Sequence, residues 1–351
     1  MRDGGYLAGS AFVETLDTRR LTELLDGIQT KHPRIAFYLS HAVTDVTDAF
    51  GRTLHMIETN KLAPTYLRNF TVWIGTRKAT QDDVERALKV LMPYVTAHVA
   101  ECADIATEFV AYQYYRIGDP DWKPPANDRF HQLSWEVVET ATHDSGVHAY
   151  WWTKIVERLQ STSDSSQVAK LLVKAMCGDN FNLKQDADRM LGLLAEAKPQ
   201  AVMDALGEMM LDETMQSWFR FQRFSVFVSL PPDVIGDWLE KNGVNGALQI
   251  AHHVPPPFLG EDQKPRLYPL TELFLGKYAL DDRVFREFVG SVHSLESYVG
   301  DIAVLKEEEA EVARKFLNHD LPRVRDWAED EIQSSTKGAR DFRALLDMQR
   351  N

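Results

Sequence analysis

Apolar residues spaced three and four positions apart recur along most of the chain, and this spacing restricts the fold more than any other feature. A long example runs through Ile35, Leu39, Ala42, Val43, Val46, Phe50, Leu54 and Ile57. In an α-helix, such spacing places the apolar side chains on one face. No Asn-Gly or Asp-Gly dipeptide joins two alternating β-branched runs, so the sequence does not indicate β-hairpins. The pattern predicts an all-α protein.

The same spacing predicts individual helices. We expect them near residues 130–142, 147–160, 166–177, 181–197, 199–211, 231–242, 245–253, 267–278, 282–291, 301–318 and 321–334. Proline is tolerated in a first helical turn, and it stands at three predicted starts, Pro199, Pro232 and Pro322. Thr80 and Asp83 have the spacing of a capping box. Asn242-Gly243 indicates a helix end, because glycine adopts the left-handed conformation at little cost.

Composition and charge narrow the class of protein. Hydrophobic residues form 44% of the 351, enough for a sizeable core. The net charge of −13 repels phosphate backbones and anionic lipid, which disfavours nucleic-acid and membrane partners. No run of 18 apolar residues is present, and the first residues lack the apolar stretch of a signal peptide. We therefore expect an acidic, soluble, cytoplasmic protein without a membrane partner.

Two stretches of the chain share one arrangement, D-x3-[VL]-[KR]-x2-A-[DE]-x2-[IL]. The matched pairs are Asp179 and Asp320, Leu183 and Val324, Lys184 and Arg325, Ala187 and Ala328, Asp188 and Glu329, and Leu191 and Ile332. We interpret the aspartate as the cap of a second helix after a tight turn. The aliphatic residue and the alanine would face a neighbouring helix, and the basic residue would reach a carboxylate in an adjacent turn.

These stretches resemble the second helix of a HEAT-type repeat, well over 307–334 and fairly over 171–195. The resemblance implies antiparallel helix pairs stacked as an α-solenoid. We expect an N-terminal all-helical region, 1–160, and a HEAT-like helical repeat region, 166–351, joined by the polar stretch 161–166. An irregular α-helical bundle is the alternative.

A helical-repeat array exposes long surfaces, so the first hypothesis is a non-catalytic scaffold that binds a protein partner. The partner would meet the concave face or the proline-rich loop 254–269, where Phe258, Leu259, Arg266 and Tyr268 offer an apolar and basic surface. A proline-stiffened strap packed over the array explains that loop equally well. His252 and His253 suit a helix C-terminus, and with Glu261 and Asp262 they could instead line a small site.

The second hypothesis is a nucleic-acid-binding HEAT-like protein. Aromatic residues and arginines alternate around Trp218, Arg220 and Arg223, as in single-strand binding surfaces, and Arg323 and Arg325 would have to share their face. A helix over 218–228, buried on one side and edged by arginines, explains the same residues. We expect that helix.

The third hypothesis is a metal-dependent enzyme that uses His143, Asp144 and His148. Residues five positions apart do not share a helical face, so an Asp144 or Ser145 helix cap is the simpler interpretation.

Other chemistry has little support in the sequence. Phosphate-binding loops, dinucleotide fingerprints and nucleophile elbows are absent, so we lean against an enzyme and expect no cofactor. No class of small-molecule substrate is indicated. Two isolated cysteines, Cys102 and Cys177, fit buried apolar positions. The acidic run 306–315 is interpreted as a solvated helix face with a Glu311–Lys315 ion pair.

Overall fold

The computed structural model describes residues 17–75, 79–113, 116, 121, 129–142, 147, 149–160, 165–178, 180–215, 224–293 and 301–350. Helices dominate these residues, and the only strands among them are β1 (Phe258–Leu259) and β2 (Pro265–Arg266), which confirms the all-α class. The chain divides into two compact units, which we describe separately. The first contains Met1–Asp164 and Lys174–Ala187, and the second contains Ser165–Val173 and Asp188–Asn351.

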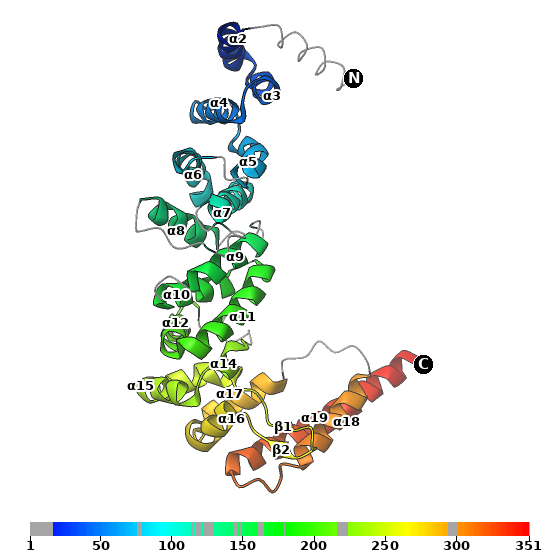
Figure 1. Cartoon of the computed structure of the whole chain (residues 1–351). Coiled ribbons are helices and arrows are strands. Elements are labelled where there is room, and N and C mark those ends of the chain that lie inside the picture. The colour runs from blue at the N-terminus through cyan, green and yellow to red at the C-terminus, as the bar shows by residue number, and fades with distance from the viewer. Residues whose placement is uncertain are drawn as a thin grey trace. The chain divides into compact units, whose positions relative to one another are not determined.

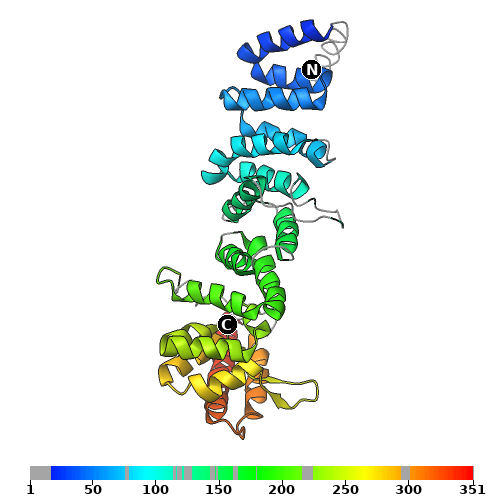
Figure 2. The same cartoon turned by 60° about the vertical axis from the view of Figure 1, so that its left-hand side comes forward.

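The first unit is a stack of helices in two layers. Its elements are α2 (Thr18–Lys31), α3 (Pro33–Val43), α4 (Val46–Glu58), the 3-10 helix η1 (Pro64–Phe70), α5 (Thr71–Gly75), α6 (Gln81–Thr96), α7 (Ala100–Gln113), α8 (Arg129–Ala141) and α9 (Ala149–Gln160). Helices α4, α6 and α8 pack in succession in one layer, and α5, α7 and α9 in the other (Figure 1). Figure 2 shows these helices stacked one above another.

Aromatic side chains fill the core at the start of this stack. The Phe50 ring lies 5.0 Å from the Phe70 ring and 5.1 Å from the Trp73 ring, centroid to centroid. The Phe37 ring meets Phe70 edge-on at 6.5 Å. These four residues come from α3, α4, η1 and α5, so the cluster joins four consecutive elements.

The apolar stripe over residues 35–57 belongs to two helices rather than to one. Helix α3 ends at Val43, and a new helix begins after Asp45. The Asp45 carboxylate caps α4 by accepting from the amides of Thr47 and Asp48 at 2.8 and 3.0 Å. Because the two helices have separate axes, the apolar residues of this stretch do not form one continuous buried face. Two of them lie on the surface, Ile35 at 52% exposure and Val46 at 36%.

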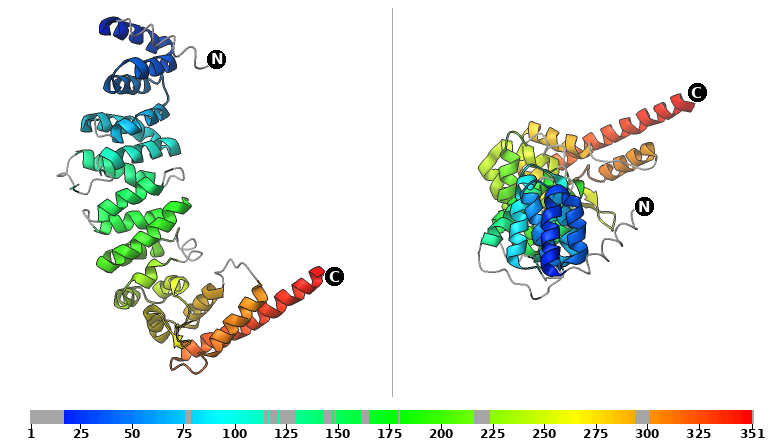
Figure 3. Two further views of the ribbon diagram at one scale, coloured as in Figure 1. Left: turned by 45° about the vertical axis from the view of Figure 1, so that its right-hand side comes forward. Right: turned by 90° about the horizontal axis from the view of Figure 1, so that it is seen from above.

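Two helices contribute residues to both units, α10 (Ser165–Met176) and α11 (Phe181–Ala197). The remaining elements of the second unit are α12 (Pro199–Leu211), α14 (Val226–Ser229), α15 (Pro232–Ile250), the 3-10 helix η2 (Ala251–His253), β1, β2, α16 (Pro269–Leu273), the π-helix η3 (Phe274–Tyr278), α17 (Asp282–His293), α18 (Ile302–Arg314) and α19 (Pro322–Arg350). Helix α15 packs against α12 and α17, and α18 lies along α19 (Figure 3).

Most predicted helix starts and the predicted stop are confirmed. Helices α12, α15 and α19 begin at their prolines, and Gly243 breaks α15 with a positive φ of 55°. Thr80 and Asp83 form the capping box of α6. The helix predicted over 267–278 is present as α16 followed by the π-helix, which accommodates an extra residue per turn.

Three expectations were wrong. Helix α19 continues to Arg350 instead of ending near 334. A short hairpin, β1–β2, occurs within the loop 254–269. Of the helix predicted over 218–228, residues 218–223 lie outside the described residues, and Phe224 and Ser225 are not helical. The carboxylate of Asp188 accepts from the amides of Ser225 and Val226, at 2.9 and 3.1 Å, and α14 therefore begins at Val226.

The shared arrangement around residues 179–191 and 320–332 has its expected buried positions. Its first aliphatic position and its alanine position are fully buried, at Leu183, Ala187, Val324 and Ala328. Its second aliphatic position is buried at Leu191 and half-buried at Ile332. Its polar positions differ from expectation. Arg325 donates to the carbonyls of His319 and Asp320, at 2.7 and 3.1 Å, instead of reaching a carboxylate. Carbonyls in such a turn lack helical partners, and the guanidinium satisfies them.

The cap of α11 also differs. Asp179 lies outside the described residues. The side-chain oxygen of its neighbour, Asn180, accepts from the Leu183 amide at 3.2 Å, which is the contact of an N-cap. Membrane-crossing segments were not expected, and no helix in the described ranges combines the length and apolar content needed to cross a bilayer.

The capping box gives a first prediction. Replacing Thr80 by Ala removes the side-chain acceptor for the Asp83 amide, which lies 3.2 Å away. We expect a loss of about 1 kcal/mol in the free energy of unfolding, measured by urea denaturation followed by circular dichroism. Thr96→Ala, at the exposed end of the same helix, is the control and should change stability little. Equal effects of the two substitutions would contradict the role of the cap.

The contact between α12 and α15 gives a second prediction. A Cβ atom on Gly207 would lie 2.3 Å from Nε1 of the nearly buried Trp238. Gly207→Ala should therefore lower the free energy of unfolding by about 1–3 kcal/mol. A Cβ on Gly290 of α17 meets nothing within 4 Å, so Gly290→Ala should raise it by about 0.5–1 kcal/mol. The same urea experiment compares them, and a stable Gly207→Ala variant would show that the helices can separate without cost.

Candidate functional site

The candidate site lies in the second unit and begins at the ribbon formed by β1 and β2. Phe258 pairs with Arg266 and Leu259 with Pro265 in antiparallel register. At the tip, the Gly260 amide donates to the Lys264 carbonyl at 3.0 Å, and Gln263 adopts a positive φ of 59°. The sequence had indicated this segment as a binding loop, and the structure shows it as an ordered hairpin.

The ribbon is fixed at its base. The rings of Phe258 and Tyr268 lie 4.5 Å apart, and Thr271 donates from its buried hydroxyl to the Pro255 carbonyl at 2.7 Å. Arg266 lies beside Gly260 and 3.5 Å from the Asp262 carboxylate. Three of the four predicted contact residues, Phe258, Arg266 and Tyr268, thus have structural contacts within the segment. The fourth, Leu259, lines a surface groove.

The groove has a volume of about 830 Å³ and lies between the ribbon and the pair of helices α18 and α19. Leu259 and Gln263 line it from the ribbon. Its helical sides carry charged residues of both signs. The α18 side has the acidic residues Glu307, Glu308 and Glu311, followed at its end by the basic residues Arg314 and Lys315. The α19 side has Arg340 and Arg343.

Two ion pairs at the groove join these charges. Arg343 of α19 reaches Glu307 of α18 at 2.6 Å. Glu311 pairs with Arg314 on the same helix, so the predicted Glu311–Lys315 pair was wrong. Arg314 and Lys315 lie three and four residues after Glu311, and both positions are its neighbours on a helix surface. Either basic residue can therefore reach the carboxylate, and Arg314 does so.

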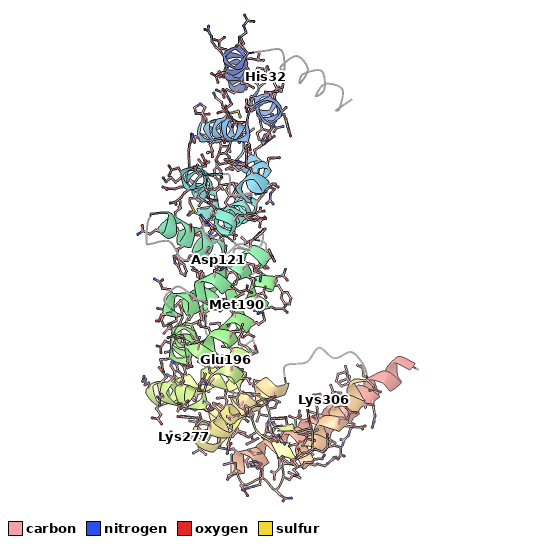
Figure 4. All side chains as sticks on the ribbon, in the orientation of Figure 1. His32, Asp121, Met190, Glu196, Lys277 and Lys306 are labelled. Atoms are coloured by element: carbon pink, nitrogen blue, oxygen red, sulfur yellow. The ribbon has the colours of Figure 1, made fainter. Side chains whose placement is uncertain are left out.

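A buried polar network holds α18 against α19 behind the groove. The hydroxyl of Ser335, which is fully buried, lies 2.8 Å from a Glu331 oxygen and 3.1 Å from a Glu309 oxygen. Lys306, labelled in Figure 4, donates to the same Glu309 oxygen at 2.6 Å. A helix pair fixed by such contacts keeps the groove lining in place.

Most residues of the other two hypotheses lie outside the described residues: His143, Asp144, His148, Trp218, Arg220 and Arg223. Arg325 binds the turn carbonyls, and Arg323 donates to Asp282 and to the Leu280 carbonyl. Both described arginines therefore have intramolecular partners.

The two consecutive histidines occupy different surroundings. His252 lies 3.1 Å from the Glu287 carboxylate of α17. His253 is buried and stacks on Phe224 and Phe227, with ring centroids 5.4 and 4.6 Å away. Asp262 lies instead beside Lys264 and Arg266. Over the ranges that the structure describes, no three or more histidine, cysteine, aspartate or glutamate side chains gather as metal ligands.

Cys102 is buried as expected, whereas Cys177 is only half-buried. Burial raises the pKa of the Cys102 thiol to about 11 and that of the Cys177 thiol to about 12. Both thiols are therefore protonated near neutral pH, whereas the thiolate is the reactive form.

Comparisons of the chain with models of known protein families, with curated proteins and with solved structures give no match. The structure itself defines an all-α protein whose helices pack against their neighbours, an arrangement compatible with a helical repeat.

Sequence reasoning missed the charged sides of the groove. The acidic run on α18 was interpreted as a solvated face, and the basic residues of α19 lie beyond the predicted helix end. The available signal was the spacing of Lys337, Arg340 and Arg343, three residues apart, after the acidic run. Such spacing places basic side chains on one face of a helix.

The thiol environment gives a third prediction. Folded protein at pH 8 should resist alkylation by iodoacetamide at both Cys102 and Cys177, because each pKa lies well above that pH. Both should be alkylated within minutes once urea unfolds the chain, as measured by mass spectrometry. A short unstructured cysteine peptide serves as the reactive control. Rapid alkylation of either residue in folded protein would contradict the raised pKa of its thiol.

Proposed function

We propose that this chain is a HEAT-like helical-repeat scaffold and that it binds a protein partner in the groove between the β1–β2 ribbon and the α18–α19 pair. The observation that carries the proposal is the groove itself, which joins Leu259 of the predicted binding loop to exposed charged residues of two helices. Support for the repeat comes from the two-layer packing of α4 to α9 and from the buried Val324 and Ala328.

The lining favours a macromolecular partner over a small metabolite. Small-molecule sites are predominantly apolar, with a few convergent polar groups. The lining of this groove instead includes exposed side chains of both charges: Glu307, Glu308, Glu311, Arg340 and Arg343. Protein interfaces combine an apolar centre with such a polar rim. Leu259 and the half-exposed Val304 supply apolar surface within the rim.

Photo-crosslinking tests the proposal. A benzoylphenylalanine placed at Thr336, which lines the groove, should crosslink a specific protein in the native cell extract. The matched control places the same residue at Ser334, an exposed position of α19 outside the groove lining. We expect capture from position 336 and none from 334.

Substitutions then test whether the groove binds that captured protein. Leu259→Asp should weaken its affinity about tenfold, because a charge replaces an apolar contact on the ribbon side of the groove. Glu261→Lys, at the exposed ribbon tip outside the lining, is the control and should leave affinity within about twofold. Capture from both crosslinker positions, or from neither, would refute the proposed function, as would an affinity unchanged by Leu259→Asp.

A further inference from the structure

We propose that the groove takes an amphipathic α-helix of the partner, with basic residues opposite the glutamates of α18 and acidic residues opposite Lys337 and Arg340 of α19. This inference rests on the proposed function and specifies the chemistry of the partner. It depends on the length of the site, its small buried residues and the charges of these residues on its two sides.

The length of the site suits three to four turns of helix. The lining residues of α18 extend from Val304 to Arg314, which is about 15 Å at the rise of an α-helix, and Lys315 follows directly after the helix. A second hollow, of about 560 Å³, shares Thr336 and Arg340 with the groove and continues along α19 to Glu329. The distance from Glu329 to Arg343 along α19 is about 21 Å.

Small residues at the seam between α18 and α19 allow a third helix to approach. Ala310 and Ala339 line the groove and are almost completely buried, and Thr336 lies beside them on α19. Alanine and threonine leave room for the apolar side chains of an incoming helix to fit between the two helices, as ridges fit into grooves. Val304, at 45% exposure, and Leu259 offer further apolar contact.

The charges on the two sides define the edges of that helix. Exposed glutamates follow the α18 side at 307, 308 and 311, and this side ends in the basic Arg314, which pairs with Glu311, and Lys315. Exposed Lys337 and Arg340 follow the α19 side, and Glu329 lies at the far end of the adjoining hollow. Glu308 and Arg340 form no ion pair with any residue in the described ranges, so a partner's charges can meet them directly. Flanking charges of this kind set partner choice and orientation in paired helices.

The same two sides argue against other occupants. A phosphate backbone would gain from the basic residues of the lining but would be repelled by Glu307, Glu308 and Glu311. A helix with basic residues opposite these glutamates and acidic residues opposite Lys337 and Arg340 meets opposite charges on both sides. The inverse helix meets like charges at the same positions. The structure therefore selects between two helices of identical composition, and an experiment can exploit that difference.

The experiment is a selection of displayed helical peptides on the full chain. Each library member has 18 residues with a fixed apolar stripe, and each edge position carries either Glu or Lys at random. We expect enrichment of peptides with Lys on one edge and Glu on the other. A designed peptide of that kind should bind at least about tenfold more tightly than its edge-inverted isomer, measured by fluorescence anisotropy.

A charge exchange supplies the decisive control. The double variant Glu308→Arg, Arg340→Glu keeps the net charge of the chain and exchanges the sign of one residue on each side. It should reverse the preference between the two isomeric peptides. The matched control, Glu213→Arg with Lys241→Glu, exchanges two exposed charges outside the groove and should leave the preference unchanged.

Three outcomes would overturn the inference: no enriched helix, enrichment without an edge preference, or a preference unchanged by the Glu308/Arg340 exchange. The failure of this inference is distinguishable from failure of the proposed function. A protein still captured from position 336 and weakened by Leu259→Asp, with no helix enriched, would retain the scaffold and reject the helical partner.

Discussion

The stability of this fold depends on burying the apolar face of each helix against the helices next to it along the chain. Helices of fewer than about 12–15 residues are marginal in water on their own. Helices α5, α14 and α16 have only five, four and five residues, so tertiary contacts must stabilise them. Longer helices bury one face in the same way. In the α18–α19 pair, α18 buries Ala303, Ala310 and Ala313, and α19 buries Val324 and Ala328.

Helix positions were largely predictable because local signals determine them. Proline at 199, 232 and 322, glycine at 243 and the Thr80–Asp83 pair act within one turn of the backbone, and the structure has each helix boundary where these residues indicate. The end of α19 was predicted wrongly, near residue 334 instead of at Arg350. Ser335 is buried and bonded to Glu331 and Glu309, and this contact with α18 supports a continuing helix.

The candidate site was only partly predictable because its residues are distant in sequence. The loop 254–269 was identified from its prolines and its length, and Leu259 lines the groove. The sides of the groove come from residues near 304–315 and 336–343, and no local pattern states that these segments lie together. Side-chain pairing was equally undetermined: Arg325 reached carbonyls of its own turn, and Glu311 paired with Arg314 rather than Lys315.

The layered packing of the first unit also bears on how the chain folds. Helices α4 to α9 contact helices that are one or two places away in the chain order, so their contacts close short loops. Proteins dominated by local contacts fold quickly, and stacked helical units can nucleate at more than one place. Since synthesis proceeds from the N-terminus at a rate far slower than helix formation, these layers can assemble while the ribosome is still adding the residues of α18 and α19.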